Sequence, residues 1–135
     1  MRKVAVIMGS TSDLPVAEKA IQTLKEYGIE TEVRVLSAHR CPNEAREFAA
    51  SARESGFSCI IALAGMDALL STVQMPSGIP VATVAIDGAK NAAILAVQIM
   101  AVSDEGLAHK LQAARDEGTA AVLKADEELR ERYKN

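Results

Sequence analysis

The chain has 135 residues, the usual length of one domain, and its net charge is −3 at pH 7. This charge argues weakly against nucleic acid as a partner, because no basic tract is present to neutralise phosphates. No apolar run approaches the ~20 residues that a membrane span needs, so no membrane partner is expected. Two cysteines, Cys41 and Cys59, make neither a disulfide framework nor a zinc site, which favours a reduced, cytoplasmic protein.

The first part of the chain alternates between an apolar strand, a helix and a second strand. The continuous apolar run Val4–Met8 predicts a strand that is buried on both faces. A turn at Gly9–Asp13 follows, and then a helix begins near Pro15 and ends at Gly28. Charged and apolar residues alternate over Thr31–Leu36, which predicts an edge strand or a half-exposed strand.

The middle of the chain repeats this alternation. Pro42 opens a second helix that ends at Gly56, and Ser58–Ala62 predicts a third buried strand. Apolar residues on one side of Gly65–Met75 predict another helix. After a Pro-Ser-Gly break, the apolar segment Ile79–Ile86 predicts a fourth strand.

The last part of the chain is predicted to be helical. Ala89–Val102 is rich in alanine and apolar nearly all round, so we expect it to be buried or to lie at an interface. Ser103 is expected to cap a last helical region that is interrupted near Gly118 and ends in a solvated charged tail, Glu127–Asn135. The whole pattern predicts one α/β domain over residues 1–135, with a parallel sheet, helices on both of its faces and a C-terminal helix.

The loop Gly9–Asp13 follows the first strand, at the edge where ligands of parallel α/β sheets bind. Its backbone N–H groups and hydroxyls suit a phosphate or a polarised carbonyl, and Asp13 could accept hydrogen bonds from sugar hydroxyls. The loop lacks both the Walker A pattern and the Gly-x-Gly-x-x-Gly spacing, so neither ATP nor a dinucleotide is indicated. The alternative is an ordinary helix cap made by Ser12 or Asp13, and the two roles can coexist.

The loop Ser37–Arg40 follows the second strand and contains one of only two histidines. Imidazoles as a class change their charge near neutral pH, so a histidine here can give and take a proton within one catalytic cycle. Arg40 presents a planar fork that suits phosphate or carboxylate, and Ser37 adds a hydroxyl. Burying the arginine charge would be costly, so the pair is not core filler; an exposed, idle pair stays open as the alternative.

Other candidate sites are weaker. His109 lies beside Lys110 on a late helix without polar company, and we interpret it as a surface or interface residue. No pair of His or Cys stands at ligand spacing, so no metal is expected. No Gly-x-Ser-x-Gly nucleophile elbow occurs, which argues against a Ser-His-Asp hydrolase.

Four stretches carry a family resemblance when they are taken together: Val6–Asp13, Ser37–Pro42, Val73–Pro76 and Ile79–Ile86. They resemble the PurE family, and the chain looks most like its class I members, the 5-(carboxyamino)imidazole ribonucleotide mutases of purine biosynthesis. The resemblance covers nearly the whole chain in order. It implies a three-layer, flavodoxin-like (Rossmann-like) fold, a homo-octamer, and a reaction that needs no metal and no organic cofactor.

The resemblance also implies which residues act. The reaction moves carbon dioxide from the exocyclic nitrogen of a ribonucleotide to ring carbon four, with His39 as the proton-transfer residue. The first loop would hold the phosphoribosyl part of the substrate, and Arg40 would meet its phosphate. The implied substrate-binding residues are Ser10, Ser12, Asp13, Ser37, Ala38 and Arg40.

The chain departs from the family pattern at one place. In the family, the third strand runs into a glycine-rich loop with a second histidine, and a helix and a further strand follow. Here Ala62 passes directly to Leu63, so roughly 30 residues, about one strand–helix unit, are absent. The absent loop would form the wall that retains carbon dioxide and positions the ring. A smaller difference is Cys41, where the family usually has Thr.

Three alternatives to the mutase stay open. A non-catalytic remnant that binds a phosphoribosyl ligand would keep Ser10, Asp13 and Arg40 without the full pocket. A carboxylase that uses carbon dioxide directly, as in the class II relatives, is the second. The third is an assembly role carried by the Ala-rich helix Ala89–Val102.

Overall fold

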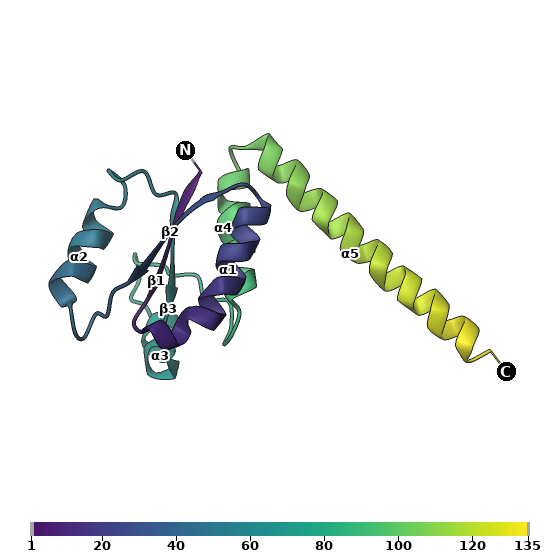
Figure 1. Cartoon of the computed structure of the whole chain (residues 1–135), viewed down its shortest axis with the longest axis horizontal. Coiled ribbons are helices and arrows are strands. Elements are labelled where there is room, and N and C mark those ends of the chain that lie inside the picture. Colours follow the sequence, from purple (N-terminus) through teal and green to yellow (C-terminus); the bar gives the residue numbers. More distant parts are fainter. Residues whose placement is uncertain (1, 135) are drawn as a thin grey trace.

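The computed structural model describes residues 2–134, with the side chains of residues 66–69 excepted. Strands and helices alternate through β3 and are followed by three helices (Figure 1). The elements are β1 (Lys3–Met8), η1 (Thr11–Asp13), α1 (Leu14–Glu26), β2 (Glu30–Val35), α2 (Pro42–Ser51), β3 (Cys59–Leu63), α3 (Met66–Val73), α4 (Ala89–Ala101) and α5 (Glu105–Arg132).

The three strands form one parallel sheet in the order β2-β1-β3. Val6 in the centre of β1 lies opposite Val33 of β2 and Ile61 of β3. Helices α1 and α4 cover one face of the sheet, and α2 lies on the other (Figure 1). This arrangement confirms the predicted three-layer parallel α/β fold, and β2 is the edge strand that its alternating sequence predicted.

The hydrophobic core lies between the sheet and the layer of α1 and α4. Val4, Val6 and Met8 point into it from β1 and are at most 1% exposed. Small residues face them from both helices, and Ala20 and Ala93 are fully buried there. Because alanine leaves little side chain between two backbones, the helices approach the sheet and one another closely. The predicted burial of the Ala-rich helix is therefore confirmed for the face of α4 that meets the core.

The opposite face of the sheet is mixed, because Ala5 and Ile7 of β1 lie next to the charged Glu32 and Arg34 of β2. It is thinly covered, since α2 has no buried residue. Lys3 pairs with Glu32 at 2.9 Å, and its ammonium lies 4.5 Å from the ring centre of Phe57. The guanidinium of Arg34 lies 5.2 Å from the ring centre of Phe48, and the two rings are 5.5 Å apart. Helix α2 is therefore held over this face by aromatic and cationic contacts rather than by a buried apolar seam.

The predicted fourth strand is wrong. Residues 79–86 form no strand, and the segment instead ends in a tight turn beside α4. Ala85 and Asp87 both adopt positive φ angles, 121° and 55°, and the N–H of Gly88 donates to the carbonyl of Ala85. The segment does not pair with β3, so its β-branched residues have no neighbouring strand.

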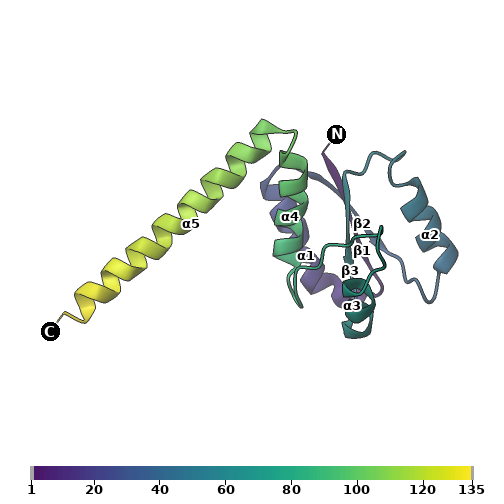
Figure 2. The same cartoon turned by 180° about the vertical axis from the view of Figure 1, so that it is seen from behind.

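The prediction for the last helix was also wrong in two respects. Helix α5 is continuous through Gly118, because one glycine costs only about 1 kcal/mol in a helix interior. Its cap is Asp104 rather than Ser103: the Asp104 carboxylate accepts a hydrogen bond from the N–H of Leu107 at 3.1 Å. The helix packs on the body through Leu107 and Leu111 and then projects away from it (Figure 2). Its charged end is exposed, as predicted.

The start of α5 is fixed to the N-terminus of the chain by an ion pair. Arg2 donates from Nε and Nη2 to the two carboxylate oxygens of Asp104, at 2.6 and 2.8 Å. The hydrogen bonds from Arg2 have the largest effect on the pKa of Asp104, and the one from the Leu107 N–H has the next largest. Together they hold this pKa below its ordinary value of 3.8. A carboxyl with a lowered folded-state pKa stabilises the fold above its unfolded pKa and loses that contribution as the pH falls through the folded pKa.

We predict that Asp104→Ala lowers the melting temperature at neutral pH by a few degrees, on the order expected for a lost helix cap, because the cap and the partner of Arg2 disappear together. The difference from wild type should shrink as the pH falls below 3.8, where the carboxyl of the wild type is progressively protonated. Thermal denaturation across a pH series measures both effects. Glu127→Ala, on the exposed part of the same helix, is the control and should change little; equal melting of Asp104→Ala and wild type at neutral pH would contradict the prediction.

Candidate functional site

Three loops begin side by side at the carboxyl edge of the sheet. Met8 ends β1 opposite Val35 of β2 and Leu63 of β3. The N–H of Leu36 donates to the carbonyl of Met8 at 2.8 Å, which ties the starts of the first two loops together. The two loops singled out by sequence therefore lie next to each other on strands that are hydrogen-bonded to one another.

The first loop is ordered by Ser10. Its hydroxyl accepts hydrogen bonds from the N–H of Ser12 at 3.3 Å and from the hydroxyl of Ser12 at 2.9 Å. Ser10 is therefore the cap of η1, a short helix that was not predicted. Asp13 stands at the N-cap position of α1, but its carboxylate makes no capping hydrogen bond there. That carboxylate is half-buried at the edge of the sheet, where it can accept hydrogen bonds from a ligand.

The second loop is closed by Ser37 and Cys41. The Cys41 N–H donates to the Ser37 carbonyl at 2.8 Å, and the Cys41 Sγ contacts the N–H and the carbonyl of Ser37 at 3.1 and 3.2 Å. The Ser37 hydroxyl accepts from the N–H of Arg40 at 3.2 Å. The Cys41 thiol thus makes the contacts to Ser37 that the hydroxyl of a threonine or serine would make at the start of α2. The closed turn leaves Ala38, His39 and Arg40 exposed.

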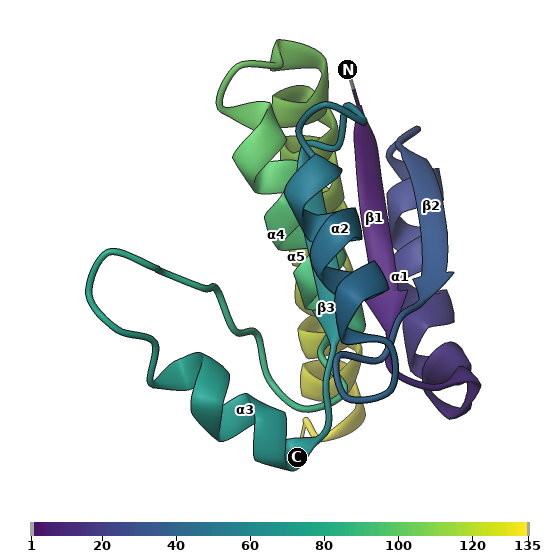
Figure 3. The same cartoon turned by 90° about the vertical axis from the view of Figure 1, so that its left-hand side faces the viewer.

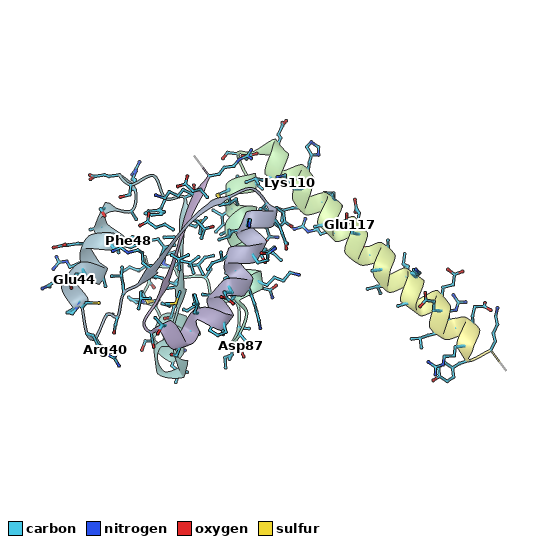
Figure 4. All side chains as sticks on the ribbon, viewed as in Figure 1. Arg40, Glu44, Phe48, Asp87, Lys110 and Glu117 are labelled. Carbon is cyan, nitrogen blue, oxygen red and sulfur yellow. The ribbon has the colours of Figure 1, made fainter. Side chains whose placement is uncertain are left out.

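All seven predicted site residues lie at one end of the sheet, but they do not share one cavity. Figure 4 shows Arg40 and Asp87 at this end, on either side of the sheet. A cavity of about 710 Å³ lies beside β3 and includes Asp13 but neither His39 nor Arg40. On the side of β2, the imidazole and the guanidinium stand open to solvent.

The cavity beside β3 was not anticipated from the sequence. Its walls are the free edge of β3, the segment 80–88 and α4. Burial in this region raises the pKa of the Cys59 thiol. The signal that could have located the cavity is the family pattern itself, since the missing strand–helix unit would follow β3 at this edge.

No helix among residues 2–134 is long and apolar enough to span a membrane.

Comparison with known proteins gives the same family that the loops resemble. The family model described as AIR carboxylase (AIRC) matches residues 3–68 and 63–121. The two matched ranges overlap at residues 63–68, where β3 ends and α3 begins. The discontinuity therefore falls at the predicted departure from the family pattern.

Two relatives are named N5-carboxyaminoimidazole ribonucleotide mutase. The protein of Methanocaldococcus jannaschii is 44% identical over 156 aligned positions, which cover 97% of this chain and 99% of that protein. The protein of Thermotoga maritima is 38% identical over 158 positions, covering 96% and 92%. Because 156 exceeds the 135 residues of this chain by 21, at least 21 aligned positions of the first relative have no counterpart here.

A crystal structure of a variant of Treponema denticola PurE2 has the same fold, with a TM-score of 0.75 and 26% sequence identity. The match covers 96% of this chain and 99% of that one. Family model, relatives and solved structure all extend over most of the sequence and include both loops at the carboxyl edge of the sheet. The chain belongs to the AIR carboxylase family, to which the PurE motifs of its two loops pointed.

Proposed function

We propose that the protein is an enzyme of purine biosynthesis that moves a carboxylate from the exocyclic nitrogen of a 5-(carboxyamino)imidazole ribonucleotide to ring carbon four. The observation that carries this proposal is the 44% identity, over 97% of the chain, with a protein named as that mutase. The proposal treats residues 1–135 as a single catalytic domain in the cytoplasm, with a small ribonucleotide as its partner and no metal or organic cofactor.

The two loops would divide the substrate between them. The Ser10 and Ser12 hydroxyls and the Asp13 carboxylate would bind the phosphoribosyl group, because they lie together at the start of α1. Arg40 would bind the phosphate through its planar fork, helped by Ser37 and Ala38 of the same turn. The closed turn supports this role, since Ser37 and Cys41 fix the backbone that presents the guanidinium.

His39 would carry the proton. The N–C bond of the carbamate breaks, carbon dioxide leaves, and the exocyclic nitrogen takes a proton from the imidazolium. Ring carbon four then forms a new C–C bond to carbon dioxide, and its own proton returns to the imidazole. One proton is given and one is taken, so a single imidazole closes the cycle without a cofactor.

A specific observation favours a second candidate, a non-catalytic module that binds a phosphoribosyl ligand. His39 and Arg40 are exposed, and the Methanocaldococcus relative has at least 21 aligned positions without a counterpart here. The two matches of the family model meet near the end of β3. Retaining carbon dioxide requires a closed site, because confinement keeps the released molecule next to the ring. The binding loops are intact, so ligand affinity without turnover is the expected behaviour of such a module.

We predict that His39→Asn lowers kcat of the isomerisation by roughly 100-fold or more, because the proton-transfer group is lost while the loop is kept. Arg40→Ala should instead raise KM by about tenfold or more, because a phosphate contact is lost. Both kcat and KM are measured by following the conversion of the carboxyamino ribonucleotide to its carbon-carboxylated isomer. His109→Asn, on exposed α5, is the matched control and should behave as wild type.

The same preparations separate the candidates. Absence of isomerisation in wild type, under conditions where an intact relative is active, rejects the mutase. Calorimetric binding of an aminoimidazole ribonucleotide that Arg40→Ala abolishes would then establish the binding module. Product formed from that ribonucleotide and carbon dioxide, but not from the carboxyamino compound, would identify the carboxylase instead.

The protein would act as a homo-oligomer, an octamer by its family resemblance. Helix α5 supports this proposal, because it projects from the body (Figure 2) and carries large apolar side chains that are exposed. Val122, Leu123 and Leu129 are 69%, 63% and 54% exposed. Such a surface is covered in most stable proteins, and a neighbouring subunit would cover it here.

We predict that light scattering gives a mass several times the 14.3 kDa of one chain. Leu123→Asp combined with Leu129→Asp should reduce that mass, since two charges would have to be buried at the interface. Lys124→Asp combined with Glu128→Lys, on the polar face, exchanges the signs of an exposed pair and should leave the mass unchanged. A monodisperse monomer in wild type would refute the oligomer.

A further inference from the structure

Residues 66–86, here called the arm, contribute nothing to the hydrophobic core as far as their side chains are described. The core cluster and the side chains packed on it include Ile61 and Leu63 and resume only at Ala89. The arm stands away from the sheet (Figure 3). It exposes large apolar side chains at Leu70, Val73, Met75, Ile79, Val81 and Ile86, which are between 36% and 71% exposed.

The arm is also uncharged over its main length. Residues 68–86 contain no Asp, Glu, Lys, Arg or His, although 24% of the chain is charged. A contiguous, uncharged, apolar surface of this kind marks an interaction site in a folded protein. Its second half, Ile79–Ile86, is rich in β-branched residues, so an added strand is the form in which it would best be buried.

The edge of β3 is a matching surface. β1 pairs with only one side of β3, and the other side faces the 710 Å³ cavity. The opposite edge of the sheet, β2, carries Glu32 and Arg34, charges of the kind that discourage strand addition. The sequence Cys-Ile-Ile-Ala-Leu of β3 carries none. The sheet is thus protected against pairing on one edge and open to it on the other.

The arm of the same chain lines the far wall of this cavity but does not pair with β3. In the range 80–85, no backbone N–H makes a hydrogen bond to another backbone group of the described residues. The segment ends in the turn at residues 85–88, where Gly88 lies so close to Val84 and Ala85 that a Cβ there would be 3.0 Å from a carbonyl oxygen. Ala85 at φ 121° adds strain that a change of path would relieve.

We infer that the groove beside β3 receives the arm of a second copy of this chain. In a two-fold exchange, Ile79–Ile86 of each copy pairs as an added strand with β3 of the other. Both surfaces are apolar and uncharged, both belong to every copy, and a reciprocal exchange leaves neither arm uncovered. The inference does not depend on the proposed reaction, since the pairing joins Ile79–Ile86 to β3 and uses neither His39 nor Arg40; Asp13 of the first loop lines the same cavity.

The test places a photoreactive side chain on the arm. Val81→benzoylphenylalanine is illuminated in the purified full chain without substrate, and the products are separated on a denaturing gel and mapped by mass spectrometry. The expected product has twice the 14.3 kDa of one chain, with the crosslink on residues 59–63 of the partner. A crosslink to β3 within a single chain shows that the arm closes on its own sheet and overturns the exchange, as does a dimer linked anywhere outside β3.

A charge on the edge supplies the control. Ala62→Lys puts the residue that natural edge strands use against pairing onto β3, where Ala62 is exposed, and should reduce the crosslinked dimer by about tenfold or more. Ala50→Lys makes the same change on the exposed surface of α2 and should leave the yield unchanged. Circular dichroism verifies that both variants fold. Equal dimer yields from folded Ala62→Lys and Ala50→Lys chains would refute the groove as the docking surface, whatever the mutase assay gives.

Discussion

The structure depends on the burial of β1. This strand is paired on both edges, and its core-facing side chains Val4, Val6 and Met8 lie against α1 and α4. A continuous apolar run can occupy only such a position, since it has no face to give to solvent. Because its partners are both parallel to it, all three strands end at the same edge. The two functional loops are neighbours for this reason and not through any contact between their own side chains.

The two faces of the sheet are stabilised by different means. On one face, alanines of α1 and α4 allow close packing, and the long helix α5 is anchored there by Leu107 and by the Arg2–Asp104 pair. On the other, α2 lies over a charged surface through the pair of Phe48 and Phe57. The relatives' additional positions would fall beside β3, at the edge that this second layer leaves uncovered. Hydrogen bonds therefore order the loops that follow β1 and β2, whereas a cavity remains next to β3.

Predictions from local sequence succeeded where one element decides its own structure. The buried strand β1, the edge strand β2, the helix beginning at Pro42 and the positions of His39 and Arg40 follow from periodicity and turn residues. They failed where the structure of a segment depends on which other segment lies beside it. The prediction that the third strand is buried was wrong, because β3 lies at the edge of the sheet and only Ile61 in it is buried. Ile79–Ile86 has the composition of a strand but no strand beside it. The roles assigned to the seven site residues stay predictions, since geometry places the residues without showing what they bind.

By itself the sequence determined the α/β alternation, the parallel sheet and the pair of loops with Ser10, Asp13, His39 and Arg40, because each of these follows from a local pattern of apolar, turn and polar residues. It also determined the family, since the motifs survive the missing unit. Only the tertiary structure decided that His39 and Arg40 stand in solvent, that the cavity lies on the other side of the sheet, and that the arm contributes nothing to the core. Those outcomes depend on which segments lie beside β3, and a strand edge acquires a partner or stays open only when the whole chain is folded.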